Sequence, residues 1–452
     1  MFTILLCRVL EPNDNHFQLH QEDRSALKTL RLVSRACQRE SEFLFFRSIA
    51  LHDKGGLAKT ISSDVMKRLQ NDKDVIIEHV RHLRVGPIAD EEWFYLLVIP
   101  SLVDILKSVK NLHSLIWEAH LSPGPNVLAF FQETHPDAQL QVICRHRRLI
   151  PMDRDLLSSS QLHTLNVTVY GNSNFTVYSN SGDAASGHHE FGILKDCLIR
   201  GNSIKVLHIA MDSTPQLDPF SSRGLCRFKS WNGVVHGLNN FDWQKGDRFP
   251  ALEELKFDYI NDRHFHFSLG NCFMWVRCMD WSKLQRLELD RGAPRPLFLA
   301  LTRRVPSLKY LKCGIWIDAI PARSNWDLRP LDTGLLILSN FLDSVPELHG
   351  LEFKTFDYGP FMEALSTMLA CQKYKLRRLD ITCTTLSMEA WTPQQFTDVI
   401  AMAPALEYLK AYIKHDILEG VWEGEKRALN PQQKYECAVK RSTLPSESVR
   451  KE

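Results

Sequence analysis

The residues of this sequence that could do chemistry lie in four short clusters, and none has the spacing of a complete catalytic or binding motif. Lys54–Thr60 (Lys-Gly-Gly-Leu-Ala-Lys-Thr) contains the lysine and threonine of a phosphate-binding loop. Ala58 stands where a glycine should precede them, so the backbone amides would not form a phosphate cradle. Arg145–Arg148 (Arg-His-Arg-Arg) could contact phosphate or an acidic partner, although a solvated surface is the simpler interpretation.

Histidine and cysteine side chains make up the other two clusters. The first contains four possible zinc ligands, but its histidines alternate with phenylalanines as in a half-buried strand, and its cysteines lack zinc-finger spacing: His264, His266, Cys272 and Cys278. The second, residues 188–190 (His-His-Glu), lies in a Gly- and Ser-rich segment that would not hold ligands in place. No nucleophile elbow, metalloprotease helix or dinucleotide-binding glycine pattern occurs. We therefore predict a protein that is not an enzyme, with no catalytic residue, metal ion or cofactor. An enzyme whose groups converge only on folding is the alternative.

Charge and cysteine content restrict the class of protein further. The 452 residues include 55 lysine and arginine and 53 aspartate and glutamate side chains, a formal net charge of +2. This balance argues against a protein that mainly binds nucleic acid or a membrane surface. The cysteines include no Cys-x-x-Cys pair, which favours reduced thiols in a cytoplasmic or nuclear protein. Residues 1–8 lack the features of a signal peptide, and the apolar stretch 94–106 is too short to cross a bilayer.

One apolar pattern recurs along the chain and predicts its fold. The pattern consists of an apolar residue, two residues of any type, a leucine, one residue of any type, and an apolar or small residue. An example is Leu284-Gln-Arg-Leu287-Glu-Leu289. The leucine and the apolar residue two positions later lie on one face of a strand. One such strand cannot bury that face alone, so the repetition predicts stacked units with a shared core. The central leucines are Leu83, Leu115, Leu165, Leu207, Leu255, Leu287, Leu311, Leu351, Leu379 and Leu409.

The segments between these strings have the spacing of helices. Apolar residues recur at three- and four-residue intervals over 96–106, 335–342 and 396–400. A proline two residues before the string stops the preceding helix and favours an extended chain at Pro250, Pro306, Pro346 and Pro404. The predicted fold class is therefore α/β: an irregular leucine-rich-repeat-like solenoid with parallel strands on one face and helices on the other. The alternative is that the Leu-x-x-Leu spacing reflects ordinary helices.

The residues on either side of each buried leucine should face the concave surface of such a solenoid. They carry both signs of charge, and tyrosines enter toward the C-terminal end, which suits a protein partner better than a polyanion. The outward set comprises His82, Arg84, Thr164, Asn166, Val206, His208, Glu254, Lys256, Arg286, Glu288, Tyr310, Lys312, Arg378, Asp380, Tyr408 and Lys410. The predicted target-binding residues are Arg286, Tyr310, Lys312, Arg378, Tyr408, Lys410 and Tyr412.

The N-terminal residues 25–52 follow a different pattern, which predicts a small helical cap that shields the first apolar face of the solenoid. Residues 40–46 form a second short helix in this prediction, with Phe43 and Phe46 three residues apart, and Ile49 and Leu51 alternate as a strand. The first helical stripe comprises Leu27, Leu30, Val33, Ser34 and Cys37.

Residues 30–51 resemble the second half of the F-box in fungal F-box/leucine-rich-repeat proteins. The resemblance rests on Leu30-Arg-Leu-Val-Ser-Arg-Ala-Cys-Gln38 and Phe43-Leu-Phe-Phe-Arg-Ser-Ile-Ala-Leu51. In that family, a helix and a strand of this kind lead into the repeats. The opening Leu-Pro-x-Glu and the first helix of the family have no clear counterpart here, and only residues 4–10, followed by Pro12, fall at the matching place.

The resemblance implies a substrate-recognition subunit of a Skp/cullin/F-box ubiquitin ligase. Such a protein binds a Skp-type adaptor, and through it a cullin, while its repeats bind a target protein. The adaptor contacts would come from Leu30, Leu32, Val33, Phe43 and Phe46. The alternatives are that these residues pack only against the repeats, and that the chain is a repeat scaffold with no ubiquitin-ligase connection.

The predicted domain organisation has three parts. Residues 1–52 form the partial F-box-like cap, and residues 53–422 form the solenoid, with a flexible insertion at 171–192 that is rich in Gly, Ser and Asn. Residues 423–452 are polar and are expected to be disordered. Residues 212–248 are rich in aromatic side chains but show no periodicity, and their role is not assigned.

Overall fold

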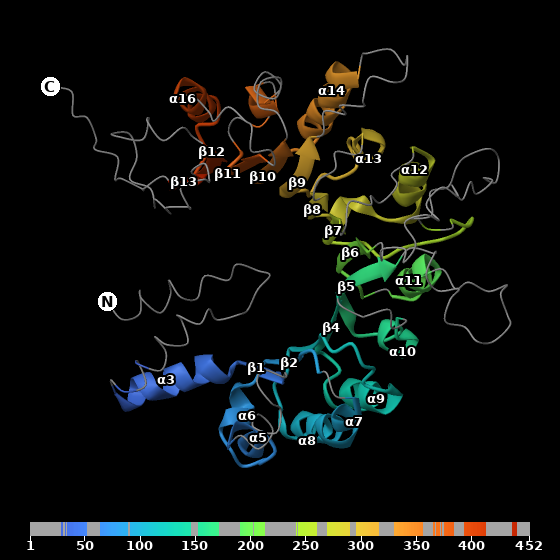
Figure 1. Ribbon diagram of the computed structural model, residues 1–452, viewed down its shortest axis with the longest axis vertical. Coiled ribbons are helices and arrows are strands. Elements are labelled where there is room, and N and C mark those ends of the chain that lie inside the picture. Colours follow the sequence, from blue (N-terminus) through green and yellow to red (C-terminus); the bar gives the residue numbers. More distant parts are fainter. Residues whose placement is uncertain are drawn as a thin grey trace, which may run out of the picture. The chain divides into compact units, whose positions relative to one another are not determined.

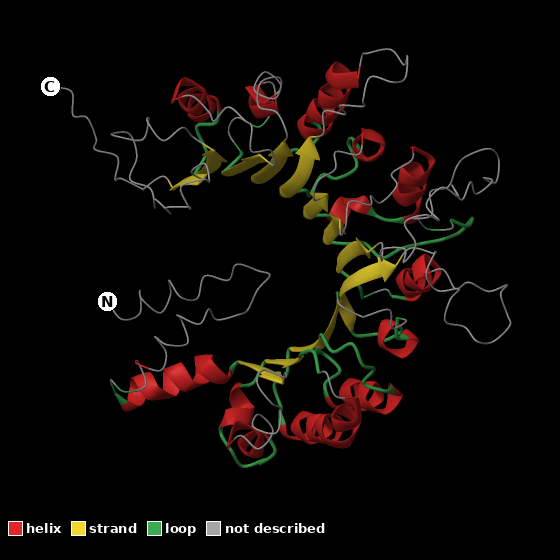
Figure 2. Cartoon of the chain, viewed as in Figure 1, coloured by secondary structure: helices red, strands yellow, loops and turns green. Residues whose placement is uncertain are grey.

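The structure is a computed structural model with parallel strands and helices that alternate along the chain (Figures 1 and 2). It describes Thr29, Leu32 and residues 34–51, 64–88, 91–145, 152–170, 190–212, 241–259, 269–289, 295–315, 330–355, 365–383, 393–412 and 436–440, except positions 202, 242, 367, 371, 373 and 374. No described helix is both long enough and apolar enough to span a membrane.

The chain divides into two compact units, residues 1–168 with 196–204 and residues 169–195 with 205–452. In the first unit, β1 to β5 pair in chain order and in parallel. In the second unit, β6 to β12 do the same, and β13 pairs antiparallel with β12. Both units are therefore α/β repeats built on a parallel sheet, as the recurring strings predicted.

In the first unit, a 12-residue helix leads into the first strand. Its elements are α3 (Arg35–Phe46), β1 (Ser48–Leu51), α5 (Asp64–Leu69), α6 (Ile76–His79), β2 (His82–Val85), α7 (Glu91–Trp93), the π-helix η1 (Phe94–Val98), α8 (Ile99–Ser108), β3 (Ser114–Trp117), α9 (Pro125–Thr134), β4 (Gln139–Cys144), α10 (Arg154–Leu157) and β5 (Leu162–Tyr170). Helix α11 (Glu190–Arg200) contributes residues to both units.

The second unit has a helix before most of its strands, and these helices lie on one side of the strands (Figure 2). Its elements are β6 (Val206–Asp212), β7 (Glu254–Tyr259), α12 (Leu269–Cys278), the 3-10 helix η5 (Trp281–Lys283), β8 (Arg286–Leu289), α13 (Arg295–Leu301), β9 (Tyr310–Ile315), α14 (Pro330–Asp343), β10 (Gly350–Thr355), β11 (Arg378–Cys383), α16 (Pro393–Met402), β12 (Tyr408–Tyr412) and β13 (Glu436–Lys440).

The leucines of the strings form the core, as predicted. All ten central leucines are buried, with exposed fractions of 3% or less. In the second unit, they lie directly opposite one another from strand to strand: Leu207, Leu255, Leu287, Leu311, Leu351, Leu379 and Leu409. Each leucine therefore packs against a central leucine of at least one neighbouring strand, which is the arrangement expected of stacked repeats.

Strand β4 was not predicted from the sequence. Its string begins with Asp137 where the pattern requires an apolar residue, but Leu140 and Val142 alternate and are both buried. Leu115 of β3 lies opposite Leu140. The long interval between Leu115 and Leu165 therefore contains a complete further repeat.

The prolines of the strings end helices as expected, and another proline distorts one. Helices α13, α14 and α16 end a few residues before Pro306, Pro346 and Pro404. Pro100 lies near the start of α8, where it has no N–H group to donate and where its ring would clash with the carbonyl four residues earlier if a regular α-helix preceded it. The chain forms the π-helix η1 immediately before this point, which accommodates the clash.

Part of the unassigned segment 212–248 belongs to the core of the second unit. Phe241, Trp243 and Phe249 pack against one another and against Trp275 of α12, with ring centroids 5.2–5.7 Å apart. Next to them, Lys195 Nζ forms a buried ion pair with Asp247 at 2.9 Å. Residues 213–240 lie outside the described part of the chain.

Four details of the sequence prediction differ from the structure. Ser34 is not part of a helical stripe with Cys37 but the N-cap of α3, with extended backbone and a side chain that accepts a hydrogen bond from the Cys37 amide. The predicted second short helix over 40–46 is the end of this single helix, because nothing interrupts it after Ser34. Helix α11 begins at Glu190, inside the predicted insertion 171–192, and strand β13 lies inside the predicted disordered tail 423–452.

Candidate functional site

The side of the second unit's strands opposite its helices carries two rows of polar side chains, which we call the polar face. The rows follow from the strand register, because residues that lie opposite each other in paired strands share a face. The first row contains Glu254, Arg286, Tyr310, Gly350, Arg378 and Tyr408, and the second contains His208, Lys256, Glu288, Lys312, Glu352, Asp380 and Lys410. Six of the seven predicted target-binding residues lie in these rows, and Tyr412 follows at the end of β12.

At the β7–β8 part of the polar face, the charged side chains form ion pairs with one another. Arg286 donates from Nε to Glu288 Oε1 at 2.6 Å, and its Nη2 lies 2.5 Å from the same oxygen. Lys256 Nζ lies 3.5 Å from Glu288 Oε2, and His208 Nε2 lies 2.7 Å from Glu254 Oε1. Burial opposes ionisation of Glu288, but Arg286 and Lys256 outweigh it and hold the pKa of that carboxyl below its usual range. The charged side chains of this part of the face are therefore paired with one another, whereas His208 Nδ1 is buried without a hydrogen bond from the described residues.

Tyr310 lies flat against the sheet at the centre of the polar face. Its ring covers Gly350 of the next strand so closely that a Cβ at position 350 would be 2.6 Å from Tyr310 Cδ2. The Arg286 guanidinium carbon lies 4.0 Å from the ring centroid, and the hydroxyl donates to Glu352 Oε2 at 2.7 Å. Glu352 Oε1 lies 2.5 Å from Lys312 Nζ, so both oxygens of this carboxylate have partners. Burial, together with the hydrogen bond to Glu352, raises the pKa of Tyr310 and keeps its hydroxyl protonated.

The β11–β12 part of the polar face contains a carboxylate that makes no hydrogen bond to the described residues. Asp380 has a side chain that is only 7% exposed, and its Oδ1 is buried and accepts no hydrogen bond from the described residues. Its Oδ2 lies 3.7 Å from Arg378 Nη2 and 4.0 Å from Lys410 Nζ, beyond hydrogen-bonding distance. Burial raises the pKa of Asp380, and Glu352 on the adjacent strand adds to the shift. The Arg378 guanidinium is stacked on the Tyr408 ring, 4.6 Å from its centroid.

Two residues of the polar face were missing from the sequence prediction. Gly350 and Glu352 flank Leu351 in the same way that the predicted residues flank their own leucines, so the string itself contained the signal. Glu352 binds two of the predicted residues, Tyr310 and Lys312. Gly350 leaves room for the Tyr310 ring.

The corresponding face of the first unit has fewer charges. His82 Nδ1 lies 2.8 Å from Ser114 Oγ, and Arg84 donates to Glu118 Oε2 at 2.8 Å. Burial, with a smaller contribution from Arg47, lowers the pKa of His82 to about 4, so this imidazole is neutral at physiological pH. The predicted basic cluster at 145–148 contributes Arg145 here, whose Nε donates to Asn166 Oδ1 at 3.0 Å. Residues 146–148 lie outside the described part of the chain.

The predicted adaptor-binding residues do not form one exposed patch among the residues described. Phe46 is buried with the Arg68 guanidinium over its ring, and Phe43 packs edge-on against His79 at 5.5 Å. Leu32 is 87% exposed. Leu30 and Val33 lie outside the described residues.

The residue types that could do chemistry are not assembled into a site in the described part of the chain. Cys272 and Cys278 are buried in α12, and burial raises the pKa of Cys272 to about 12. No group of three or more His, Cys, Asp or Glu side chains is placed to hold a metal ion among the described residues. The segments 54–60, 188–189 and 264–266 lie outside them.

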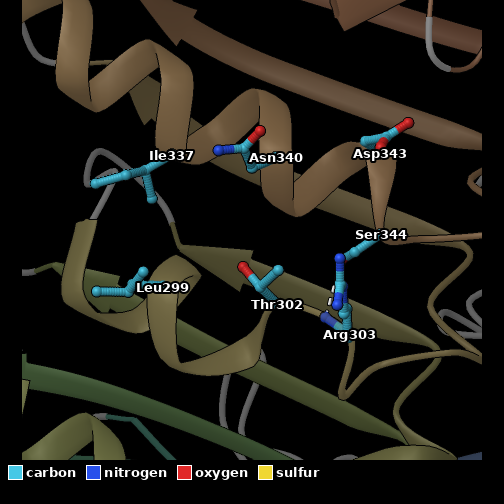
Figure 3. A pocket seen from close by; sticks show the side chains of 7 residues that line it. All are labelled: Leu299, Thr302, Arg303, Ile337, Asn340, Asp343 and Ser344. Carbon is cyan, nitrogen blue, oxygen red and sulfur yellow. Dashed lines mark hydrogen bonds between the residues drawn. The ribbon is translucent and has the colours of Figure 1, made fainter.

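A groove of about 620 Å³ lies between α13 and α14, on the helix side of the second unit (Figure 3). It is lined by Leu299, Thr302, Arg303, Ile337, Asn340, Asp343 and Ser344. Arg303 has a left-handed backbone (φ 65°), and its amide donates to Ser344 Oγ at 3.0 Å. The groove lining contains no histidine, cysteine or paired carboxylates and therefore suggests no catalytic chemistry.

Comparison with known proteins identifies no family for this chain. No protein-family model and no curated protein matches the sequence. Among solved structures, it is similar to a structural-genomics crystal structure of a Bacteroides fragilis protein, with 10% identity, coverage of 81% of this chain and 84% of that chain, and a TM-score of 0.25. A TM-score this low supports no conclusion about the function of this chain.

Proposed function

We propose that this chain is a protein-recruitment subunit that binds a target protein on the polar face of its second unit. The observation that carries the proposal is the arrangement of that face: stacked arginine–tyrosine pairs and fixed charges on a rigid sheet. Arginine and tyrosine are the residues that most often dominate the energy of protein interfaces. Parallel strands whose leucines are locked in register hold these side chains in place, which lowers the entropy cost of binding.

Within this function, we propose the role of substrate-recognition subunit of a Skp/cullin/F-box ubiquitin ligase. The proposal rests on the resemblance of residues 30–51 to an F-box and on the position of Leu32, an exposed leucine next to α3. An exposed leucine in this position suits docking of a Skp-type adaptor. The ubiquitin chemistry would then be done by other subunits.

A repeat scaffold without a ubiquitin ligase is the second candidate. It is favoured by the packing of Phe43 and Phe46, two of the five predicted adaptor contacts, against the chain itself. In this case α3 only covers the end of the repeat array, and the polar face binds a single partner.

Quantitative affinity purification with the full chain tests both levels of the proposal. Arg378→Glu should remove the target proteins and leave the adaptor bound. Leu32→Asp should remove the adaptor and leave the targets bound, with Leu336→Asp as the control, because Leu336 of α14 is another exposed leucine (59%). Failure to recover an adaptor with the wild-type chain would reject the ligase role. If neither Arg378→Glu nor Tyr310→Ala lowers the recovery of the target proteins, the polar face is rejected as the binding surface.

A further inference from the structure

The two parts of the polar face differ in charge. On β7 and β8, the acidic side chains outnumber the basic ones: Glu254, Asp258 and Glu288 against Lys256 and Arg286. On β9 to β12, four basic side chains oppose two acidic ones, a formal excess of +2: Lys312, Lys354, Arg378 and Lys410 against Glu352 and Asp380. The polar face therefore has a basic part, which is where the tyrosines Tyr310 and Tyr408 lie.

Arg378 is the residue of the basic part that has unused hydrogen-bonding capacity. Its side chain is 51% exposed, stacks on Tyr408 and makes no hydrogen bond to the described residues. Arg286 occupies the equivalent place on β8 and stacks on Tyr310 in the same way, but two of its nitrogens bind Glu288. The Arg378 guanidinium is therefore held in position with its donors available, a geometry that matches a carboxylate.

Asp380 is too short to satisfy Arg378. Both Asp380 and Glu288 lie two residues after an arginine of the same row, but the glutamate has one more methylene and reaches its arginine at 2.5 Å, whereas the aspartate stays at 3.7 Å. The neighbours differ too: Glu288 lies between two lysines, Lys256 and Lys312, while Asp380 lies between Glu352 and Lys410. Burial and Glu352 both raise the pKa of Asp380, and its Oδ2 stays beyond hydrogen-bonding distance of Arg378.

We propose that the basic part of the polar face binds an acidic segment of the recruited protein, with an aspartate or glutamate carboxylate of that segment paired to Arg378 beside Lys410. The inference rests on the recruitment function proposed above and specifies the chemistry of its partner. A carboxylate would supply the two acceptors that Asp380 does not. A nucleic acid fits less well, because Glu352, Asp380 and the acidic β7–β8 part would repel a continuous row of phosphates.

A peptide library supplies a defined probe. Random 12-residue peptides displayed on phage are selected on the immobilised full chain, and the enriched sequences are synthesised with a fluorescent label. We expect an excess of aspartate and glutamate in these peptides. Their dissociation constants, measured by fluorescence polarisation, should rise at least about tenfold with Arg378→Gln, the loss expected of a charge-assisted pair. Arg377→Gln is the matched control, because this neighbouring arginine is 63% exposed and lies one residue before β11, outside the two rows.

Two substitutions at Asp380 test whether this carboxylate competes with the peptide for Arg378. Asp380→Asn removes a competing negative charge without a change of shape and should strengthen binding of the acidic peptides about threefold or more. Asp380→Glu should weaken it, because the longer side chain can reach Arg378 and occupy its donors. Weaker binding with Asp380→Asn would overturn the inference, since it would mean that the partner donates a hydrogen bond to Asp380 instead.

The remaining outcomes separate this inference from the proposed function. Enriched peptides without an acidic excess, which depend on Tyr310 and Arg286 but not on Arg378, would overturn the acidic-segment inference and leave recruitment by the polar face intact. Peptides that depend on no residue of the polar face would overturn both. A single-stranded 20-mer oligonucleotide that binds more tightly than the peptides, with the same dependence on Arg378, would replace the acidic protein segment with nucleic acid.

Discussion

Gly350→Ala is the substitution that most directly tests the packing of the polar face. A Cβ at position 350 would lie 2.6 Å from Cδ2 and 3.2 Å from Cε2 of Tyr310, so the ring must leave its place on the sheet. That movement breaks the hydrogen bond from the Tyr310 hydroxyl to Glu352 and the contact of the ring with Arg286. A hydrogen bond to a charged group contributes about 1.5–3 kcal/mol and an exposed cation–π pair about 0.5–1 kcal/mol.

Alanine also has an advantage over glycine in a strand, which offsets about 0.5–1 kcal/mol of this loss. We therefore expect Gly350→Ala to lower the free energy of unfolding by about 1–3 kcal/mol, measured by urea denaturation at neutral pH. Gly270→Ala in α12 is the control, because a Cβ there meets no atom within 4 Å. It should be neutral or raise the free energy of unfolding by up to about 1 kcal/mol.

The cause of the loss is tested in a double-mutant cycle with Tyr310→Ala. Once the ring is removed, Gly350→Ala has nothing to displace and should cost no stability. An equal cost of Gly350→Ala in the wild-type and Tyr310→Ala backgrounds would refute the reasoning. It would mean that the backbone, not the tyrosine ring, requires glycine at this position.

Three further substitutions have defined expectations. Leu287→Ala should lower the free energy of unfolding by about 2–5 kcal/mol, because Leu287 is fully buried between two other central leucines; Leu336→Ala, at a 59% exposed position, should change it by less than about 0.5 kcal/mol, and similar effects of the two would contradict the stacked core. Arg303→Gly should raise the free energy of unfolding, measured by thermal denaturation, by about 0.5–1 kcal/mol, because the left-handed backbone there disfavours an L-residue. No gain would show that the arginine side chain offsets the cost of this backbone conformation. Burial raises the pKa of Asp380 in the folded protein above its unfolded value of about 3.9. The protonated carboxyl therefore contributes stability that is fully present below the unfolded pKa and is lost as the pH rises through the folded pKa, because the folded state disfavours the ionised form. Asp380→Asn should therefore become increasingly more stable than the wild type in urea titrations from pH 4 to pH 7, and a constant difference would contradict the raised pKa.

The strands could be predicted from the sequence because burial alone specifies them. A leucine and an apolar residue two positions later are enough to define the buried face, and eight of the nine intervals between successive strings contain no further strand among the described residues. The exception is the interval that contains β4, where Asp137 breaks the pattern. A polar residue is tolerated there because it precedes the strand and lies outside the alternating part, Leu140 and Val142.

Element boundaries at the N-terminus could not be predicted in the same way. Apolar periodicity continues through Ser34, so the stripe looked uninterrupted, but the serine side chain satisfies the Cys37 amide and starts a new helix. Helical periodicity cannot reveal this, because the cap depends on a local hydrogen bond and not on the spacing of apolar residues. The same reasoning applies to α11, whose start at Glu190 follows a segment without any periodic pattern.

The strings at 284–289 and 376–381 show which property of the site could not be predicted from the sequence. Both place an arginine before the central leucine and an acidic residue after it, so a sequence pattern treats Arg286 and Arg378 as equivalent. The structure makes them different for two reasons: glutamate reaches its arginine and aspartate does not, and the adjacent strands surround Glu288 with lysines but place Glu352 opposite Asp380. The second reason depends on strand register, which joins residues about 30 positions apart in the chain. A repeat protein of this kind can therefore keep its core pattern constant while single methylene groups and neighbouring charges decide which arginine is neutralised internally and which is available to a partner.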